Sequence, residues 1–319
     1  MVLLLQYTLI FASVLMLVAL GGCFAERSGV INIGLEGIMV IGALGGALVM
    51  KFLPVSVGAP VMVIATVLAS AVFGLVFSLL LAVAAINFKA DQTITGTAMN
   101  MLATAGATVA VKAMNTAASN GNDVSSDIVY TAAKDLFIVR FGSFEFNWFM
   151  LVAVICLVIS YVVLYKTRFG LRLRSCGENP QAADSLGINV KKMRYAGTTI
   201  SGALAGMGGF VYALTTANCT ANGDVAGFGF LALAVMIFGN WKPLNIAGSA
   251  VIFGLFKCIA ASYASIDING DGIFLLKELN VSTHLYRMLP YLITLVVLAF
   301  TSQKSRAPKA EGIPYDKGQ

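Results

Sequence analysis

Charged residues are scarce in this sequence. Asp, Glu, Lys and Arg together make up 11% of the 319 residues, whereas soluble chains carry about 25%. Hydrophobic residues make up 58%, and the mean hydropathy is +0.86. This balance excludes an ordinary soluble domain and predicts an all-α integral membrane protein. The net charge of +6 does not indicate nucleic acid, because the basic residues are not gathered on one soluble face.

Groups typical of catalysis are also missing. His284 is the single histidine, and the sequence contains neither a Gly-x4-Gly-Lys-Ser/Thr phosphate loop nor a His-Glu-x-x-His motif. The five cysteines are scattered, without the spacing of a disulfide framework or a metal site. We therefore expect no enzymatic activity and no cofactor in this chain. Any energy from nucleotide hydrolysis must come from another chain.

Long stretches without charge are present instead. Because about 20 apolar residues cross a bilayer as a helix, we expect about nine transmembrane helices, within a range of about 8–10, including broken or re-entrant segments. The transmembrane domain should cover residues 1–302, with a cytoplasmic loop at 166–192 and a basic cytoplasmic tail at 303–319. The expected helices cover residues 3–24, 35–53, 60–86, 92–114, 147–165, 193–214, 226–240, 244–265 and 285–302.

The distribution of Lys and Arg sets the orientation. Cytoplasmic loops of membrane proteins are enriched in these residues. One set of alternate loops holds Arg27, Lys89, the seven bases of 166–194, Lys242 and the four bases of the tail. The opposite set holds Lys51, Lys134, Arg140 and Lys277. The N-terminus is therefore expected outside and the C-terminus in the cytoplasm.

Small residues recur at four-residue intervals in two of the expected helices. Gly197, Ser201, Ala205 and Gly209 share one face, and a Gly-x3-Gly pair begins at Gly42. Such faces are typical of helices whose backbones approach closely.

The basic inner loop contains the signals of a short helix. Asn179 suits the N-cap, Pro180 the first helical position, and Gly187 a left-handed stop. We therefore expect a two-turn helix that lies on the cytoplasmic surface. Its exposed side would be small and uncharged, which lets a partner approach closely. That side comprises Ala182, Ala183 and Ser185. The alternative is a positively charged linker that only returns the chain to the membrane.

The segment 26–39 joins two expected helices while remaining largely apolar and rich in glycine. Irregular backbone of this kind is held inside a membrane protein or against a cavity. Glu36 is its notable residue, because a carboxylate near the membrane usually faces a partner or water. Alternatively, Glu36 lies at the interface near the start of its helix, where the helix dipole favours it.

A polar stripe follows the fourth expected helix at three- and four-residue spacing. It consists of Thr93, Thr97, Asn100, Thr104, Thr108 and Lys112. Such a stripe could line a route for a hydrogen-bonding solute. Alternatively, the threonines bond carbonyls of their own helix and pack against neighbouring helices.

The loop 267–278 fits the calcium-loop pattern Asp-x-Asp/Asn-x-Asp/Asn-Gly-x5-Glu. The ligands would be Asp267, Asn269, Asp271, the carbonyl of Ile273 and a bidentate Glu278. Leu275 at position nine weakens the fit, and polar turns of this composition are common. A bound calcium ion would staple the loop and would not perform transport.

Five segments, 26–39, 177–190, 201–206, 227–243 and 306–315, occur in a recognisable order. The second begins Gly-Glu-Asn-Pro-Gln-Ala-Ala. In this order they resemble permease subunits of bacterial ABC importers, and most closely the nucleoside-importing branch. The resemblance covers nearly the full chain. The loop 267–278 departs from the pattern, so the resemblance adds nothing to the calcium hypothesis.

The resemblance implies a multi-pass subunit of the bacterial cytoplasmic membrane. Its partners would be a second, related permease, a cytoplasmic ABC ATPase that binds ATP and Mg²⁺, and an extracytoplasmic solute-binding lipoprotein that delivers the nucleoside. ATP-driven closure of the ATPase pair would tilt coupling helices and open the permeases to each side in turn. The residues implied to contact the ATPase are Asn179, Pro180, Ala182, Ala183, Ser185 and Gly187. The translocation path would use Glu36, Thr93, Thr97, Asn100, Thr104 and Thr108.

Three other functions were weighed against this one. A permease for ribose or another simple sugar is the nearest, because ribose is common to both solutes. An ion-coupled secondary transporter would need buried ionisable groups such as Glu36, Lys112 and Lys257, but it leaves the inner loop unexplained. A membrane enzyme is disfavoured by the absence of a catalytic set.

Overall fold

The computed structural model describes residues 2–121, 125–129, 136–141, 144–217, 220–262, 282–301 and 306–316. Helices make up most of them. The helices are α1 (Val2–Arg27), α2 (Leu35–Phe52), α3 (Ala59–Ala82), α4 (Gln92–Ala118), α5 (Trp148–Lys166), α6 (Arg168–Glu178), α7 (Pro180–Ser185), α8 (Val190–Thr215), α9 (Phe228–Phe238), α10 (Pro243–Ser262) and α12 (Thr283–Thr301). A π-helical turn, η2 (Val83–Asn87), extends α3, and a 3₁₀ turn, η1 (Val55–Val57), precedes it.

Two small antiparallel pairs of strands join the loops. Strand β1 (Ile128–Val129) pairs with β4 (Thr220–Ala221). Strand β2 (Ile138–Phe141) pairs with β3 (Phe144–Asn147) in the register Ile138 to Asn147.

Each helical range expected from the sequence contains a helix. Within the described part of the chain, six helices are long and apolar enough to cross a membrane: α1, α2, α3 with η2, α4, α5 and α10. The helix α9 is different, because its 11 residues extend only about 16 Å at 1.5 Å per residue. That is about half of the 30 Å apolar layer of a bilayer. The chain is thus a mostly helical, multi-span membrane protein with at least one short internal helix.

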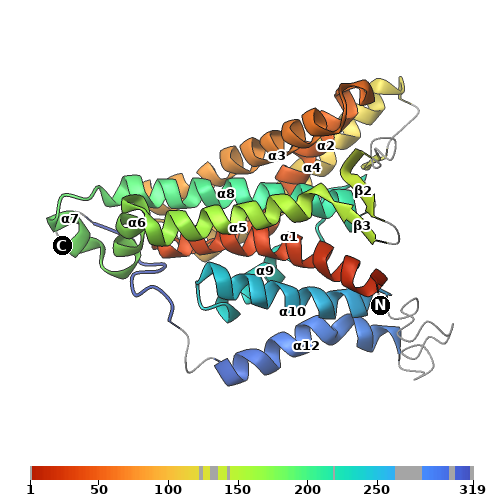
Figure 1. Ribbon diagram of the computed structural model, residues 1–319. Coiled ribbons are helices and arrows are strands. Elements are labelled where there is room, and N and C mark those ends of the chain that lie inside the picture. Colours follow the sequence, from red (N-terminus) through yellow and green to blue (C-terminus); the bar gives the residue numbers. More distant parts are fainter. Residues whose placement is uncertain are drawn as a thin grey trace.

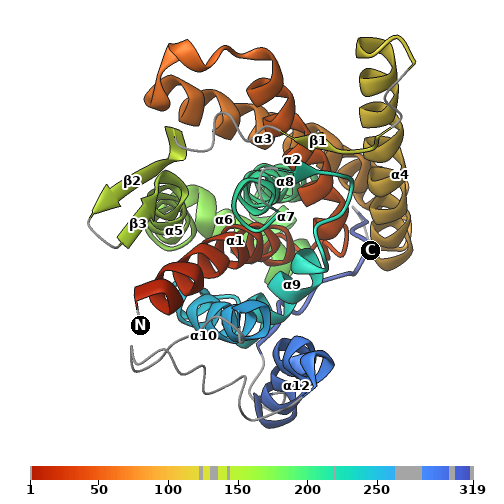
Figure 2. The same ribbon diagram turned by 90° about the vertical axis from the view of Figure 1, so that its right-hand side faces the viewer.

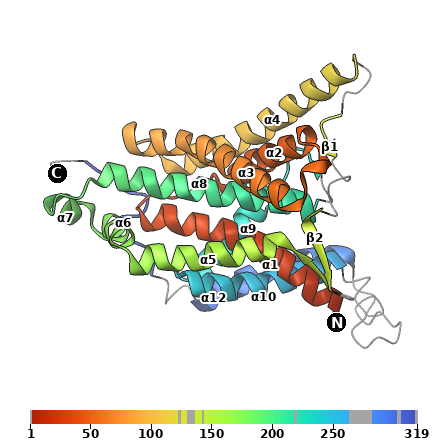
Figure 3. The ribbon, with the colours of Figure 1, turned by 45° about the horizontal axis from the view of Figure 1, so that its top comes forward.

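The long helices run side by side, with α6 and α7 at one end of the bundle and the N-terminus at the other (Figure 1). Viewed from the end that carries the N-terminus, α1 and α8 occupy the middle, while α3, α4, α5, α10 and α12 surround them (Figure 2). The burial of α1 agrees with this position, since 89% of its most apolar stretch of 18 residues is buried. A third view again places α6, α7 and the C-terminus together at one end (Figure 3).

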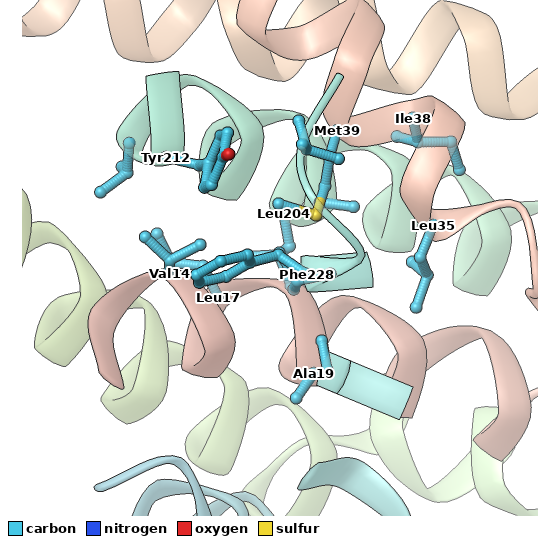
Figure 4. Close-up of a cluster of buried hydrophobic side chains, with 14 of the residues drawn as sticks. Val14, Leu17, Ala19, Leu35, Ile38, Met39, Leu204, Tyr212 and Phe228 are labelled. Carbon is cyan, nitrogen blue, oxygen red and sulfur yellow. The ribbon is translucent and has the colours of Figure 1, made fainter. Parts of the chain in front are cut away.

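The core forms where α1, α2, α8 and α9 meet (Figure 4). Leu17 and Leu35 are 0% exposed and Phe228 is 1% exposed. Phe228 packs against the Tyr212 ring, with centroids 4.8 Å apart. Burial of apolar side chains that belong to four helices fixes the start of the short helix α9 relative to the long ones.

Glycine permits the closest helix contacts. A Cβ atom at Gly42 of α2 would lie 2.2 Å from Cα of Gly206 in α8. A Cβ at Gly209 would lie 1.9 Å from the Met39 carbonyl oxygen. The prediction of a close-packed face on this helix is therefore confirmed.

The surrounding helices expose apolar surface. In each of α3, α4 and α5, only 28% of the most apolar stretch of 18 residues is buried. Ile64, Leu68 and Val72 on α3 are 59%, 59% and 53% exposed. In water such a surface would drive association, so these faces suit lipid or another membrane subunit.

Candidate functional site

The short helix α7 has the capping pattern expected from its sequence. The Asn179 Oδ1 atom accepts a hydrogen bond from the Ala182 N–H at 3.0 Å, and Pro180 occupies the first turn. Gly187 ends the helix with φ +78°, and its N–H donates to the Asp184 carbonyl at 2.8 Å. These caps satisfy backbone groups that a helix of this length would leave free.

The orientation of α7 corrects one prediction. Ala183 was expected on the exposed side, but it is 2% exposed. Pro180, three residues earlier, is also buried. Successive helical residues point about 100° apart, so Ala182 and Ala183 face different directions. The exposed side chains are Gln181, Ala182, Ser185 and Leu186.

Ala183 lies in a small apolar cluster that we call the α7 seat. The seat consists of Cys176, Ala183, Val190 and Tyr315. Burial raises the pKa of the Cys176 thiol. Tyr315 is 7% exposed, and burial together with the nearby Asp184 carboxylate of α7 raises the pKa of its hydroxyl. The seat is separate from the main core.

The helix α6 was not predicted, because the sequence 166–178 was treated as part of a basic loop. Its buried residues Gly170, Leu173 and Gly177 are three and four positions apart, which is helical spacing. The Thr167 hydroxyl caps it by accepting from the Gly170 N–H at 3.1 Å. This periodicity was the available signal.

Glu36 links the starts of two helices. It is the second residue of α2. Its Oε1 accepts from the Gly227 N–H at 2.7 Å, and its Oε2 accepts from the Gly229 N–H at 2.6 Å. We call this pair of bonds the Glu36 clasp. The carboxylate binds free N–H groups at the N-terminus of α9, where the helix dipole also favours negative charge.

The position of the clasp along the bundle follows from the length of α9. The other end of α9 lies beside the end of α1, because Arg27 Nη2 donates to the Trp241 carbonyl at 3.0 Å. The clasp therefore lies about 16 Å along α9 from the end that meets α1, at 1.5 Å per residue. Glu36 lies at the start of α2, as the interfacial interpretation expects, and its carboxylate also has a partner in α9, as the other interpretation expects.

Other polar groups lie near the clasp. The Lys257 ammonium group interacts electrostatically with Glu36 and lies 4.6 Å from the centroid of the Phe228 ring. Asp224 also interacts with Glu36. Asp224 was missed by the sequence analysis, because its distance from Glu36 along the chain left no local signal.

The polar stripe of α4 divides into two groups. The Thr97 and Thr108 hydroxyls donate to the carbonyls of Thr93 and Thr104 in the same helix. Thr93, Thr97 and Thr104 are exposed.

Asn100 has a different role in the same stripe. Its Oδ1 accepts from the Gly37 N–H at 2.8 Å and its Nδ2 donates to the Ile33 carbonyl at 3.1 Å. Asn100 therefore holds the irregular segment that precedes α2. The structure thus brings Asn100 close to Glu36, the residue before Gly37.

Comparison with known proteins identifies the family. The family described as "Branched-chain amino acid transport system / permease component" matches residues 4–298. The chain belongs to this family. It is a multi-pass protein of the cytoplasmic membrane and a non-catalytic membrane component. No solved structure gives a significant match.

Three relatives are informative. The chain is 41% identical to the guanosine ABC transporter permease protein NupQ of Bacillus subtilis, covering 98% of this chain and 96% of the relative. It is 38% identical to the nucleoside ABC transporter permease protein NupC of Lactococcus lactis, with the same coverage of each chain. It is 26% identical to the guanosine ABC transporter permease protein NupP of Bacillus subtilis, covering 73% of this chain and 67% of the relative.

The possible calcium loop of this permease lies outside the described residues. It comprises Asp267, Asn269, Asp271, Ile273 and Glu278. It stays a prediction from the sequence.

Proposed function

We propose that the chain is the permease subunit of an ATP-driven importer that carries nucleosides across the cytoplasmic membrane. The observation that carries this proposal is α7, a capped surface helix whose outward side presents the small residues Ala182 and Ser185. A partner can approach such a surface closely. The names of NupQ and NupC support nucleosides as the solute. A ribose or simple-sugar permease is the nearest alternative.

The orientation in the proposal places the N-terminus outside and α7 in the cytoplasm, with nine crossing helical segments including the broken one. The α7 end of the bundle supports it. Arg168 and Arg172 begin α6, Lys191 and Lys192 begin α8, and Lys242 precedes α10. Positive charge at one end is the pattern of cytoplasmic loops.

The proposed partners are a second permease, a cytoplasmic ABC ATPase and an extracytoplasmic binding lipoprotein. Two guanosine permeases of Bacillus subtilis, NupQ and NupP, both resemble this chain, which supports a heterodimer of related permeases. The exposed apolar faces of α3, α4 and α5 suit contact with lipid or with that second permease. ATP and Mg²⁺ would bind the ATPase.

The proposed solute path runs between the Glu36 clasp and the exposed threonines of α4. Thr93, Thr97 and Thr104 are exposed, and the Thr97 hydroxyl bonds to a carbonyl of its own helix. A surface of this kind offers weak hydrogen bonds to ribose and base without holding them. Asn100 and Glu36 would shape the path, because their bonds fix the starts of α2 and α9.

In this mechanism the ATPase acts on α7 from the cytoplasm. Closure of the ATPase pair would move α7 and, through the α7 seat, the ends of α6 and α8. Since the long helices pack through glycine contacts, they would move as a body and would not bend locally. The two permeases would then open their shared path to each side in turn.

The test is uptake into vesicles that contain the complete complex with its binding protein. Radiolabelled guanosine and uridine should accumulate with ATP and not with ADP, and a proton ionophore should leave uptake unchanged. Excess ribose should compete weakly. Uptake that follows the proton gradient with ATP maintained would contradict the proposal, and strong competition by ribose would favour the sugar alternative.

A further inference from the structure

The C-terminal tail runs toward α7 along this end of the bundle (Figure 1), and it bonds to several elements along its way. The Arg306 N–H donates to Asn240 Oδ1 at 2.9 Å, just after α9. The Ala310 N–H donates to the Gly177 carbonyl of α6 at 2.8 Å. These bonds engage backbone groups, so they hold the path of the tail and not only its side chains.

The tail then reaches α1 and α8. The Gly312 N–H donates to the Gly29 carbonyl at 3.2 Å, beyond the end of α1. The Ile313 carbonyl accepts from Nη1 of Arg194 in α8 at 2.8 Å, and Arg194 is 1% exposed. A buried guanidinium that bonds the tail would lose this partner if the tail left.

The end of the tail supports α7. Tyr315 closes the α7 seat against Cys176, Ala183 and Val190. Its hydroxyl lies near the Asp184 carboxylate of α7. One residue further, Asp316 pairs with Lys89 near the start of α4. The tail therefore contacts α7 on one side, and the ends of α1 and α8 and the turn after α9 on the other.

A helix as short as α7 does not fix its own position. It has six residues, and isolated helices shorter than about 12 residues are marginal in water. Its place depends on the surfaces beneath Pro180 and Ala183. Tyr315 supplies the largest side chain of that surface.

We propose that residues 306–316 form a strap that fixes α7 to the cytoplasmic ends of α1, α8 and α9, with Tyr315 as its positioning residue. The inference rests on the proposed function in one respect, namely that α7 receives the ATPase. With the strap in place, a push on α7 moves α1, α8 and α9 together. Without it, α7 yields and hydrolysis is separated from transport.

Cys176 offers a direct readout of the strap. It is 0% exposed, and Tyr315 covers it in the α7 seat. A chain in which Cys23, Cys156, Cys219 and Cys258 are replaced by Ala leaves it as the single thiol. Its rate of labelling by a maleimide then measures how often the tail leaves.

The test compares three variants of this chain in the complete complex. Tyr315→Ala should raise the labelling rate of Cys176 by about tenfold or more, because the seat opens locally. Tyr315→Phe keeps the packing and removes only the hydroxyl near Asp184, so its rate should rise by no more than about fivefold. Ile313→Ala is the control, since this tail side chain is 54% exposed, and its rate should not change.

The second readout is ATP hydrolysis stimulated by the permease, with nucleoside uptake measured beside it. In Tyr315→Ala we expect fewer nucleosides imported per ATP, with the subunits still co-purifying, and Tyr315→Phe should recover most of the ratio. Unchanged labelling would overturn the strap, and raised labelling with an unchanged transport ratio would overturn its role in coupling. Failure of the proposed function can be told apart from failure of the strap. If wild type stimulates hydrolysis but imports no nucleoside, the solute is wrong, while labelling and hydrolysis still decide the strap.

Discussion

The α7 seat and the polar face of α4 hold their side chains in different ways. In the seat, Ala183 and Tyr315 are 2% and 7% exposed, and their neighbours come from α6, α8 and the tail. On α4, Thr97 and Thr108 bond only to their own helix. A surface that receives force has to be fixed by other elements. A surface along which a solute passes has to offer polar groups that are already satisfied and bind weakly.

The largest effect is expected from a charge placed in the seat. Ala183→Glu buries an unpaired carboxylate, which costs about 3–5 kcal/mol. We expect α7 to leave its seat, Cys176 to become reactive and uptake to fall to background. The matched control is Gln181→Glu on the exposed side of α7, which should leave Cys176 protected. Equal labelling in both variants would show that Ala183 does not rest on the seat.

The next effect concerns the Glu36 clasp. Glu36→Gln keeps the size of the side chain but offers one acceptor to two N–H groups, each worth about 1.5–3 kcal/mol when bonded to a carboxylate. Uptake should fall by about tenfold or more. Glu145→Gln in β3, outside the proposed path, serves as the control and should import normally. Import by Glu36→Gln at the wild-type rate would remove the clasp from the mechanism.

A third pair of changes separates the two kinds of residue on α4. Asn100→Ala leaves the Gly37 N–H and the Ile33 carbonyl without their partner, so stability should fall by about 1–3 kcal/mol. Thr97→Val removes an exposed hydroxyl bonded to its own helix, so stability should stay within about 0.5 kcal/mol while uptake falls modestly. Thermal unfolding in detergent measures the first effect and vesicle uptake the second. The division of the stripe fails if Thr97→Val melts earlier than Asn100→Ala.

The smallest effect that we expect is a dependence of tail docking on pH. Burial raises the pKa of Glu311, whose carboxyl lies near Glu26 and Arg27 of α1. Docking of the tail therefore favours the protonated form. The contribution of Glu311 to docking of the tail is present below the usual Glu pKa of about 4.3. It is lost as the pH rises through the higher pKa that Glu311 has in the docked tail.

Labelling of Cys176 should report this loss. The rate in wild type, divided at each pH by the rate in Glu311→Gln, should rise by less than about threefold as the pH increases. The division cancels the intrinsic reactivity of the thiol. A ratio that falls with pH would mean that the charged carboxylate favours docking.

Much of the fold could be predicted from the sequence. Apolar runs set the long helices, and the caps at Asn179 and Gly187 set α7, because these signals are local. The glycine face of α8 was also readable. The helix α6 was missed because its sequence is rich in arginine and was treated as a basic loop, although Leu173 and Gly177 follow a helical period.

The candidate site was less predictable, because its contacts join distant segments. Glu36 meets Gly227 and Gly229 through the packing of α2 against α9, which no local pattern reveals. The same holds for Tyr315 under α7. Ala183 was placed on the wrong side because small size was taken as a sign of exposure, whereas it equally suits close packing.

If the exposed side of α7 receives the ATPase, Ala182→Glu should disrupt that contact and little else. Ala182 is exposed, whereas its neighbour Ala183 is buried, so the change adds bulk and charge to the docking face without entering the seat. We expect uptake and permease-stimulated ATP hydrolysis both to fall by about tenfold or more, while the two permeases co-purify and Cys176 stays protected. Ala182→Ser should behave as wild type. Unchanged uptake and hydrolysis in Ala182→Glu would show that this side of α7 does not receive the ATPase.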